Sequence, residues 1–205
     1  MVSWATAWNH VLETHGFVHI PKTGGTSIES KLTNETAIIL RQHPGPKPRA
    51  SPWHLPVDEY EATYAPLKYK RPTFCVVREP RDRLRSCMAW PYSSRFRTPF
   101  DELARTFAGG RRGVRWSEEY VHRAPQSWFV WNEDGSVACD CVIAYPKLDA
   151  VFSTVHKNRG ARADPKLRES SFPRQLYAMD ALLYGAALRA DGLCYAPAPL
   201  YAPSE

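Results

Sequence analysis

The chain has 205 residues, of which 43% are hydrophobic and 23% charged, so it is long enough to bury a core without a metal or a disulfide framework. Its 27 basic and 21 acidic side chains leave a net charge of +6, which favours an anionic partner such as a nucleotide, an acidic glycan, a nucleic acid or a membrane surface. No stretch of about 18 apolar residues is present, and the first residues lack the basic-then-apolar pattern of a signal peptide, so neither a membrane span nor a leader is expected.

Five cysteines occur in the chain, an odd number with no Cys-x-x-Cys pair among them. This pattern favours reduced, mostly buried thiols of an intracellular protein over a disulfide framework. We therefore expect a cytoplasmic protein, although a chain trimmed of an N-terminal membrane anchor would have the same composition. The cysteines are Cys75, Cys87, Cys139, Cys141 and Cys194.

The first half of the chain alternates short apolar runs with segments rich in glycine or proline. Trp4, Trp8 and Val11 recur at helical spacing ahead of Gly16, and five prolines over 44–56 predict a loop. In chain order we expect a helix over 1–16, a strand over 17–20, a helix over 28–32, a strand over 36–40, the loop over 44–56 and a helix over 59–64.

The second half contains the clearest buried strand, Thr-Phe-Cys-Val-Val over 73–77, which Pro80 ends by starting a helix. In chain order we expect this strand, helices over 80–90 and 99–107, a basic loop over 109–113, a strand over 141–145, and helices over 147–155 and 172–189. Strands that alternate with helices predict an α/β fold with a central, mainly parallel sheet flanked by helices. No repeat or domain boundary interrupts the pattern, so we expect one domain over 1–205.

The segment Pro-Lys-Thr-Gly-Gly-Thr-Ser over 21–27 lies between a predicted strand and a predicted helix, which is typical of a phosphate-binding loop. Glycines let the backbone approach an anion, loop N–H groups point at it, and the helix start adds partial positive charge. The Walker pattern is absent, because here the lysine precedes the glycines. The alternative is a turn whose lysine faces solvent. The candidate anion-binding residues are Lys22, Thr23, Gly24, Gly25, Thr26 and Ser27.

A second strand-to-helix corner carries Arg78 at the tip of the strand over 73–77 and Ser86 eight residues later. Ser86 would lie roughly 9 Å along a helix that begins at Pro80, so the two side chains could grip one anion between them. Ligands of parallel sheets bind beyond the carboxyl ends of the strands, where Arg78 is expected. Three further arginines of this helix are interpreted as surface charges: Arg81, Arg83 and Arg85.

With both corners in view, the sequence resembles the sulfotransferase superfamily that uses 3′-phosphoadenosine 5′-phosphosulfate (PAPS), especially the carbohydrate branch related to heparan and chondroitin enzymes. The family's 5′-phosphosulfate loop, PK[TS]GGTS, is present unaltered over 21–27, and its 3′-phosphate motif, VRDPxxRLxS, is present over 77–86 with Glu79 in place of aspartate. Weaker similarities are H-x-x-P-Q over 122–126 and Y-x-x-D over 177–180. The resemblance implies a P-loop-like fold and PAPS as cosubstrate, with PAP as its product.

The resemblance also implies a mechanism, in which sulfuryl transfer needs a cation at the leaving phosphate and a base at the acceptor hydroxyl or amine. Lys22 is the expected cation, and His54 lies at a spacing like that of the branch's catalytic histidine. His43, Asp58 and Glu59 remain alternatives for the base. Arg159, in a late basic segment, is a further candidate for the 3′-phosphate.

The acceptor is expected to be a carbohydrate, with a small soluble metabolite as the alternative. No metal is expected, because the lysine and backbone donors neutralise the phosphosulfate, and His10, His15 and His19 share no helical face. A kinase would need a Walker lysine after the glycines, and a nucleic-acid or glycan-binding module a continuous basic stripe. A set of arginines is interpreted as solvated loop, with contact to an acidic acceptor as the alternative: Arg95, Arg97, Arg111, Arg112 and Arg115.

Overall fold

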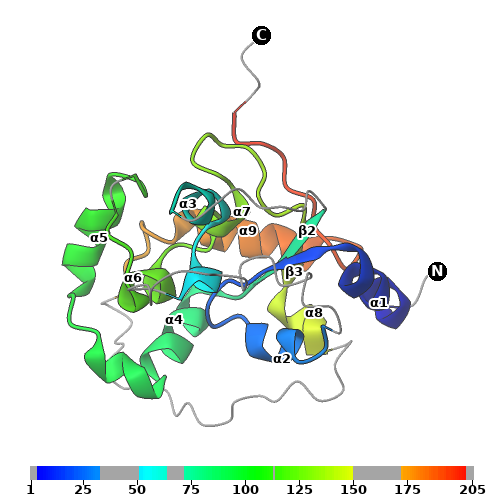
Figure 1. The fold of residues 1–205 in the computed structure, drawn as a ribbon, viewed down its shortest axis with the longest axis horizontal. Helices are drawn as coiled ribbons and strands as arrows, with labels where there is room; N and C mark the ends of the chain where they lie inside the picture. The colour runs from blue at the N-terminus through cyan, green and yellow to red at the C-terminus, as the bar shows by residue number, and fades with distance from the viewer. Residues whose placement is uncertain (1–3, 33–50, 64–71, 113, 150–171, 202–205) are drawn as a thin grey trace.

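The computed structural model describes residues 4–32, 51–63, 72–112, 114–149 and 172–201. Three parallel strands form a small sheet in the order β1-β2-β3, which are Gly16–Val18, Thr73–Val77 and Cys141–Ala144. Helices lie on both sides of this sheet, as Figure 1 shows, so the expected α/β architecture with a parallel sheet is confirmed. The strand expected over 36–40 lies outside the described residues.

The helices of the described ranges lie near the predicted ones, but the last helix, expected over 172–189, begins only at Ala178, and two short α-helices, α6 and α7, were not predicted. The α-helices are α1 (Trp4–Thr14), α2 (Gly25–Glu29), α3 (Val57–Thr63), α4 (Pro80–Met88), α5 (Phe100–Ala108), α6 (Glu118–Arg123), α7 (Ser127–Val130), α8 (Tyr145–Asp149) and α9 (Ala178–Arg189). Two 3-10 helices are η2 (Pro52–His54) and η3 (Pro91–Arg95). None of the helices placed by the structure has the length and apolar character needed to cross a bilayer.

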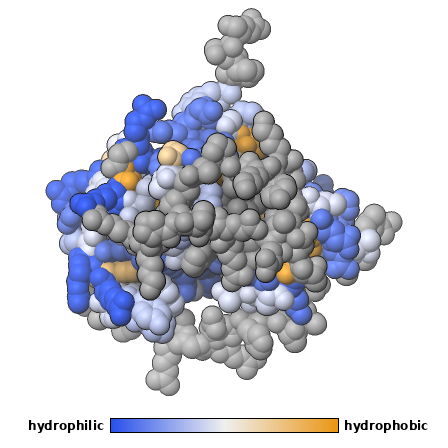
Figure 2. Space-filling view, in the orientation of Figure 1, coloured by the Kyte–Doolittle hydropathy of each residue, from blue (hydrophilic) through white to orange (hydrophobic). Residues whose placement is uncertain are grey.

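The two faces of β2 build two separate hydrophobic clusters, because successive strand residues point to opposite sides of a sheet. Phe74 and Val76 join the cluster that includes residues of α1, α2 and α8, whereas Cys75 and Val77 join the cluster with residues of α5, α7 and α9. Hydrophobic residues show only as separate spots on the described surface in Figure 2, which agrees with a core held between the helical layers.

The parallel pairing brings the carboxyl ends of the three strands to one edge of the sheet. Phe17 lies opposite Phe74 in the β1–β2 register, and Val77 lies opposite Ala144 in the β2–β3 register. The segments that leave this edge are the phosphate-loop candidate after β1, Arg78 after β2 and Tyr145 after β3. Ligands of open parallel sheets bind at such an edge, so the fold places the candidate residues where the sequence predicted them.

Four of the five cysteines form disulfides, which contradicts the expectation of reduced thiols. Cys75 of β2 pairs with Cys139, and Cys141 of β3 pairs with Cys194. The partners are 64 and 53 residues apart in sequence, and the β2–β3 register and the bridge between Val142 and Tyr195 bring them close together. Disulfides persist in oxidising compartments, so the cysteines do not support a cytoplasmic location. Cys87 is a free, buried thiol.

Candidate active site

The loop between β1 and α2 is a turn that contains two residues with a positive φ. Gly24 has a φ of 93° and Lys22 a φ of 69°, and the left-handed region is one that a lysine rarely adopts. Such backbone conformations gather at ligand-binding sites, where the surrounding structure holds them. The Thr23 hydroxyl donates to the Ile20 carbonyl at 2.7 Å inside the loop, so this side chain braces the turn and is not the exposed anion donor expected.

The α2 helix that follows the loop has only five residues, Gly25–Glu29, and therefore adds little dipole. Donors for an anion must come mainly from loop N–H groups and from side chains. Thr26 is exposed, and Ser27 and Lys22 are partly buried, so all three side chains reach the surface of the site. Burial and the nearby Arg78 guanidinium lower the pKa of Lys22, while Cys87 opposes that shift.

Position 25 needs a glycine because the His19 ring leaves no room for a side chain, and not because its backbone angles demand one. A Cβ added at Gly25 would lie 2.0 Å from Nε2 of His19, a distance that no side chain can tolerate. The other ring nitrogen of His19, Nδ1, lies 2.8 Å from the Glu29 carboxylate at the far end of α2. The imidazole therefore spans α2 from its first residue to its last and fixes the helix against the loop.

The second corner joins the first directly. Nη1 of Arg78 donates to the Lys22 carbonyl at 3.4 Å, and the guanidinium lies 4.9 Å from the centre of the Tyr145 ring. Gln126 holds the backbone of Arg78 at both ends, accepting from its N–H at 2.8 Å and donating to its carbonyl at 2.9 Å. Arg78 is thus aimed across the edge of the sheet by a buried amide. Ser86 lies partly buried on the following helix α4.

Glu79, which replaces the aspartate of the resembling motif, caps α4 by accepting from the Asp82 N–H at 2.7 Å. Arg83, expected on the surface, is only 1% exposed, which corrects that expectation. It donates to the carbonyls of Pro21, His122 and Ala124, and so ties the phosphate-loop candidate to α6. A periodicity argument could not place it, because its partners are backbone carbonyls far away in sequence.

His54 lies at the end of η2, between two other imidazoles. Its ring is 4.7 Å from the centre of His19 and 4.9 Å from that of His122, edge-on to both. The Trp90 indole stacks on His122 at 4.5 Å, and Nζ of Lys22 lies 5.3 Å from that indole. We call His19, His54 and His122, with Lys22 beside them, the histidine cluster.

Burial is the largest influence on the pKa values of His54 and His122 in the histidine cluster. It lowers the pKa of His54 well below the ordinary value, and the nearby His19, His122 and Lys22 lower it further. Burial also lowers the pKa of His122 to about 4, against a hydrogen bond with the Glu118 backbone that opposes the shift. Both rings are neutral near pH 7, and a neutral imidazole can accept a proton.

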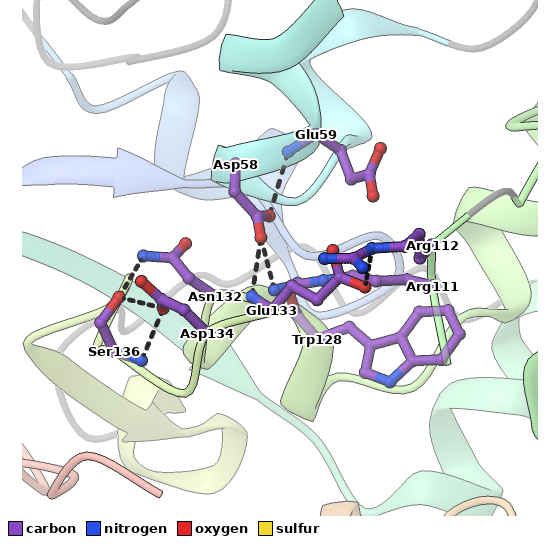
Figure 3. Close-up of polar contacts among 9 residues, drawn as sticks. All are labelled: Asp58, Glu59, Arg111, Arg112, Trp128, Asn132, Glu133, Asp134 and Ser136. Atoms are coloured by element: carbon purple, nitrogen blue, oxygen red, sulfur yellow. Dashed lines mark hydrogen bonds and ion pairs between the residues drawn. The ribbon is translucent and has the colours of Figure 1, made fainter. Parts of the chain in front are cut away.

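Two alternatives for the base, Asp58 and Glu59, lie in the first turn of α3 (Figure 3). Asp58 forms an ion pair of 2.6 Å with Arg111 and accepts from the Glu133 N–H at 2.8 Å. Burial raises the pKa of the Glu59 carboxylate, which lies near the charges of Asp58 and Arg111. Arg111 is 4% exposed, so it is neither solvated nor open to an acceptor, and that expectation is corrected. His43, the third alternative, and Arg159 lie outside the described residues.

Sequence reasoning missed how the weaker similarities work together. The Asp180 carboxylate accepts from the N–H groups of Gln126 at 2.7 Å and Ser127 at 2.9 Å, and the Tyr177 hydroxyl donates to the Arg123 carbonyl at 2.5 Å. The last helix therefore fixes Gln126, which in turn fixes Arg78. The two segments, over 122–126 and 177–180, were noted in the sequence. Neither segment indicates by itself that it contacts the other.

A donor group of another kind arises where η2 meets α6. His54, Glu118 and His122 each offer an atom of metal-ligand type, and these atoms lie within 4.8 Å of one another. Atoms that share a zinc ion lie closer, roughly 3.5 Å apart at bond lengths of about 2.0–2.2 Å. Lys22 adds positive charge beside both histidines, and Glu118 already accepts hydrogen bonds from Ser51. We interpret the group as a polar cluster in which Glu118 contacts His122 and Ser51.

The site thus combines a glycine turn, two cations and a neutral imidazole at the carboxyl edge of a parallel sheet. Cations and loop N–H groups can hold a phosphate-like anion, and an imidazole beside them can accept a proton from a second molecule. Comparisons of the chain with protein-family models, with curated proteins and with solved structures found no match.

Proposed function

We propose that the protein is a PAPS-dependent sulfotransferase with the P-loop-like fold of that superfamily, moving a sulfuryl group to a hydroxyl or amine of an acceptor. The observation that carries the proposal is the junction of the two corners, where Nη1 of Arg78 donates to the Lys22 carbonyl at 3.4 Å. The two motifs of the resemblance are 56 residues apart in sequence and meet at one point of the fold. A nucleotide that carries phosphate groups on both the 3′ and the 5′ position of its ribose would need both corners at once.

In this proposal the loop over 22–27 and Lys22 bind the 5′-phosphosulfate, and Arg78 with Ser86 binds the 3′-phosphate. Negative charge develops on the bridging oxygen as the sulfuryl group leaves, and Lys22 offsets it. The partial burial of Lys22 supports this role, because a charge acts more strongly where water is scarce. The cations of the site meet the charge of the nucleotide, and no metal ion is given a role.

His54 is the proposed base. The acceptor oxygen forms a bond to sulfur while the bond from sulfur to the bridging phosphate oxygen breaks, and the acceptor proton passes to the His54 imidazole. The products are the sulfated acceptor and PAP. Burial lowers the pKa of His54, so the ring is unprotonated near pH 7, as a proton acceptor must be. Asp58 is a poor rival, because its carboxylate is already held by Arg111.

The acceptor proposed first is a carbohydrate hydroxyl, in line with the branch that the sequence resembles, and a small soluble metabolite is the alternative. Both acceptors use the same transfer step. The site itself supports the step and leaves the acceptor to be found by experiment.

The test is the melting temperature of the protein with PAP, with ADP and with ATP plus magnesium, each at the same concentration. Stabilisation by PAP in EDTA, with little from ADP, is expected, because ADP lacks the 3′-phosphate. The Arg78→Gln variant should lose most of the difference between PAP and ADP. Stabilisation by ATP plus magnesium alone would contradict the proposal and favour a kinase.

A further inference from the structure

Glu118, the first residue of α6, connects two segments that the proposed mechanism needs. Its Oε1 accepts from the backbone N–H of Ser51 at 2.5 Å and also from the Ser51 hydroxyl. Its Oε2 lies 3.4 Å from Nδ1 of His122, one helical turn along α6. One carboxylate therefore contacts both the start of η2, which carries His54, and His122 of α6.

The contact at Ser51 is passed to His54 through the backbone. Ser51 is the N-cap of η2, and its carbonyl accepts from the His54 N–H at 2.9 Å. The Leu55 N–H closes the same turn onto the Pro52 carbonyl at 3.1 Å. A shift of Ser51 would therefore move the short turn and the imidazole at its end together.

Glu118 is also the carboxylate of the group around the His54 ring. A ring nitrogen of His54 lies within 4.8 Å of an oxygen of Glu118. The other groups facing His54 are His19, His122 and Lys22, which all disfavour a positive charge on the ring. When His54 accepts a proton, the Glu118 carboxylate is a negative charge close to the ring.

We propose that Glu118 is a positioning residue that fixes His54 for proton acceptance and compensates its charge afterwards. The inference rests on the proposed function, in which His54 is the base. Its neighbour Glu119 supplies a matched comparison, since it also accepts backbone N–H groups, from Arg97 at 3.1 Å and Thr98 at 2.9 Å, and pairs with Arg123 at 2.6 Å. Glu119 makes its backbone contacts with the segment between η3 and α5.

The test compares Glu118→Ala, Glu118→Gln and Glu119→Ala by two readouts, steady-state transfer from PAPS and the imidazole ¹⁵N resonances of His54. Glu118→Ala should lower kcat about 10–100-fold, with KM for PAPS within about twofold, because a displaced base costs rate and not nucleotide binding. Glu118→Gln keeps an oxygen for Ser51 and should recover part of kcat, with an altered acid limb in the pH profile. Glu119→Ala should leave the His54 resonances unchanged.

Wild-type kcat and unchanged His54 resonances in Glu118→Ala would overturn the inference. If the wild-type protein transfers no sulfuryl group, the proposed function fails, and the resonances still decide whether Glu118 holds the ring. Should Glu118→Ala not fold, Ser51→Ala removes only the hydroxyl contact and takes its place. It should shift the His54 resonances and lower kcat, and an unchanged kcat with unshifted resonances would contradict the role.

Discussion

Two polar groups of this molecule treat charge in opposite ways. In the Asp58 group a buried guanidinium is matched by a carboxylate, with Arg111 and Asp58 2.6 Å apart (Figure 3). In the histidine cluster burial keeps His54 and His122 uncharged, and Lys22 has no carboxylate among the causes that shift its pKa. In the first group the cation itself is paired with a carboxylate, whereas in the second the nearby carboxylates, Glu29 and Glu118, contact the rings of His19 and His122.

The difference distinguishes an ion pair that stabilises the fold from a group that can bind a ligand. A matched ion pair fixes α3 to the segments that carry Arg111 and Glu133, and it has nothing left to offer a ligand. An unmatched cation beside neutral bases costs stability in the free protein, and a bound anion removes that cost. The histidine cluster is therefore the region where we place the chemistry, and each prediction below tests whether the two groups differ in this way.

Lys22→Ala should have the largest effect, lowering transfer on the order of 10³-fold, because it removes the charge at the leaving oxygen. Alanine has the same backbone cost as lysine at a φ of 69°, so the fold should be kept. Kinetics and a melting curve check both points. Lys31→Ala, at an exposed lysine just after α2, is the control. Full activity in Lys22→Ala would show that the loop does not serve the transfer step.

His54→Asn should lower kcat by a few hundredfold while the dissociation constant for PAP stays within about twofold. The variant keeps a polar side chain but has no ring nitrogen to accept a proton. Calorimetric titration with PAP and initial rates separate the two quantities. If PAP affinity falls as much as kcat does, His54 binds the nucleotide and another group is the base; His43→Asn is then the next variant.

The stability of the histidine cluster should depend on pH in the range between the folded and unfolded pKa values. His122 titrates at about 4 in the fold and at about 6.5 when unfolded, so below pH 6.5 the unfolded state binds the extra proton. Stability should therefore fall as pH is lowered from about 6.5 to 4, by on the order of 3 kcal/mol from this residue. Denaturant curves measured at several pH values for wild type and His122→Asn test this. An equal change in the free energy of unfolding with pH in both proteins would refute it.

Asp58→Asn should have the smallest effect of the four variants, and it should lower stability instead of transfer activity. It leaves the buried Arg111 without its counter-charge, which costs about 2 kcal/mol, less than a fully buried pair because the Asp58 side chain is 28% exposed. Transfer by the folded protein should be unchanged. A large loss of kcat with normal stability would mean that Asp58 is the base and that the two groups have been assigned the wrong way round.

Much of the scaffold follows from local pattern. The strand over 73–77 coincides with β2, and the edge of the sheet carries both strand-to-helix corners as expected. The loop over 21–27 and Arg78 were chosen as candidates from residue types and spacing, and their role as an anion site stays a prediction.

What the sequence left out depends on contacts between distant segments. The roles of Arg83, Gln126 and Glu118 all lie in hydrogen bonds to backbone groups at least 39 residues away, which no periodicity records. The disulfides were missed for the same reason, since cysteine spacing does not determine which cysteines pair. Arg111 was expected at the surface because it lies in a basic loop between glycines, yet the Asp58 carboxylate and the Trp128 carbonyl, both distant in sequence, hold it in a buried position.

The most direct measurement is a titration of the ¹⁵N-labelled protein with PAP, followed through the side-chain resonances of the histidines and of Arg111. We expect the His54 and His19 imidazole signals to shift as PAP binds, while the Arg111 Nε–H signal stays in place, and ADP should cause smaller shifts. Saturation with PAP that leaves the histidine signals unmoved, or that moves Arg111 instead, would contradict the assignment of the site to the histidine cluster.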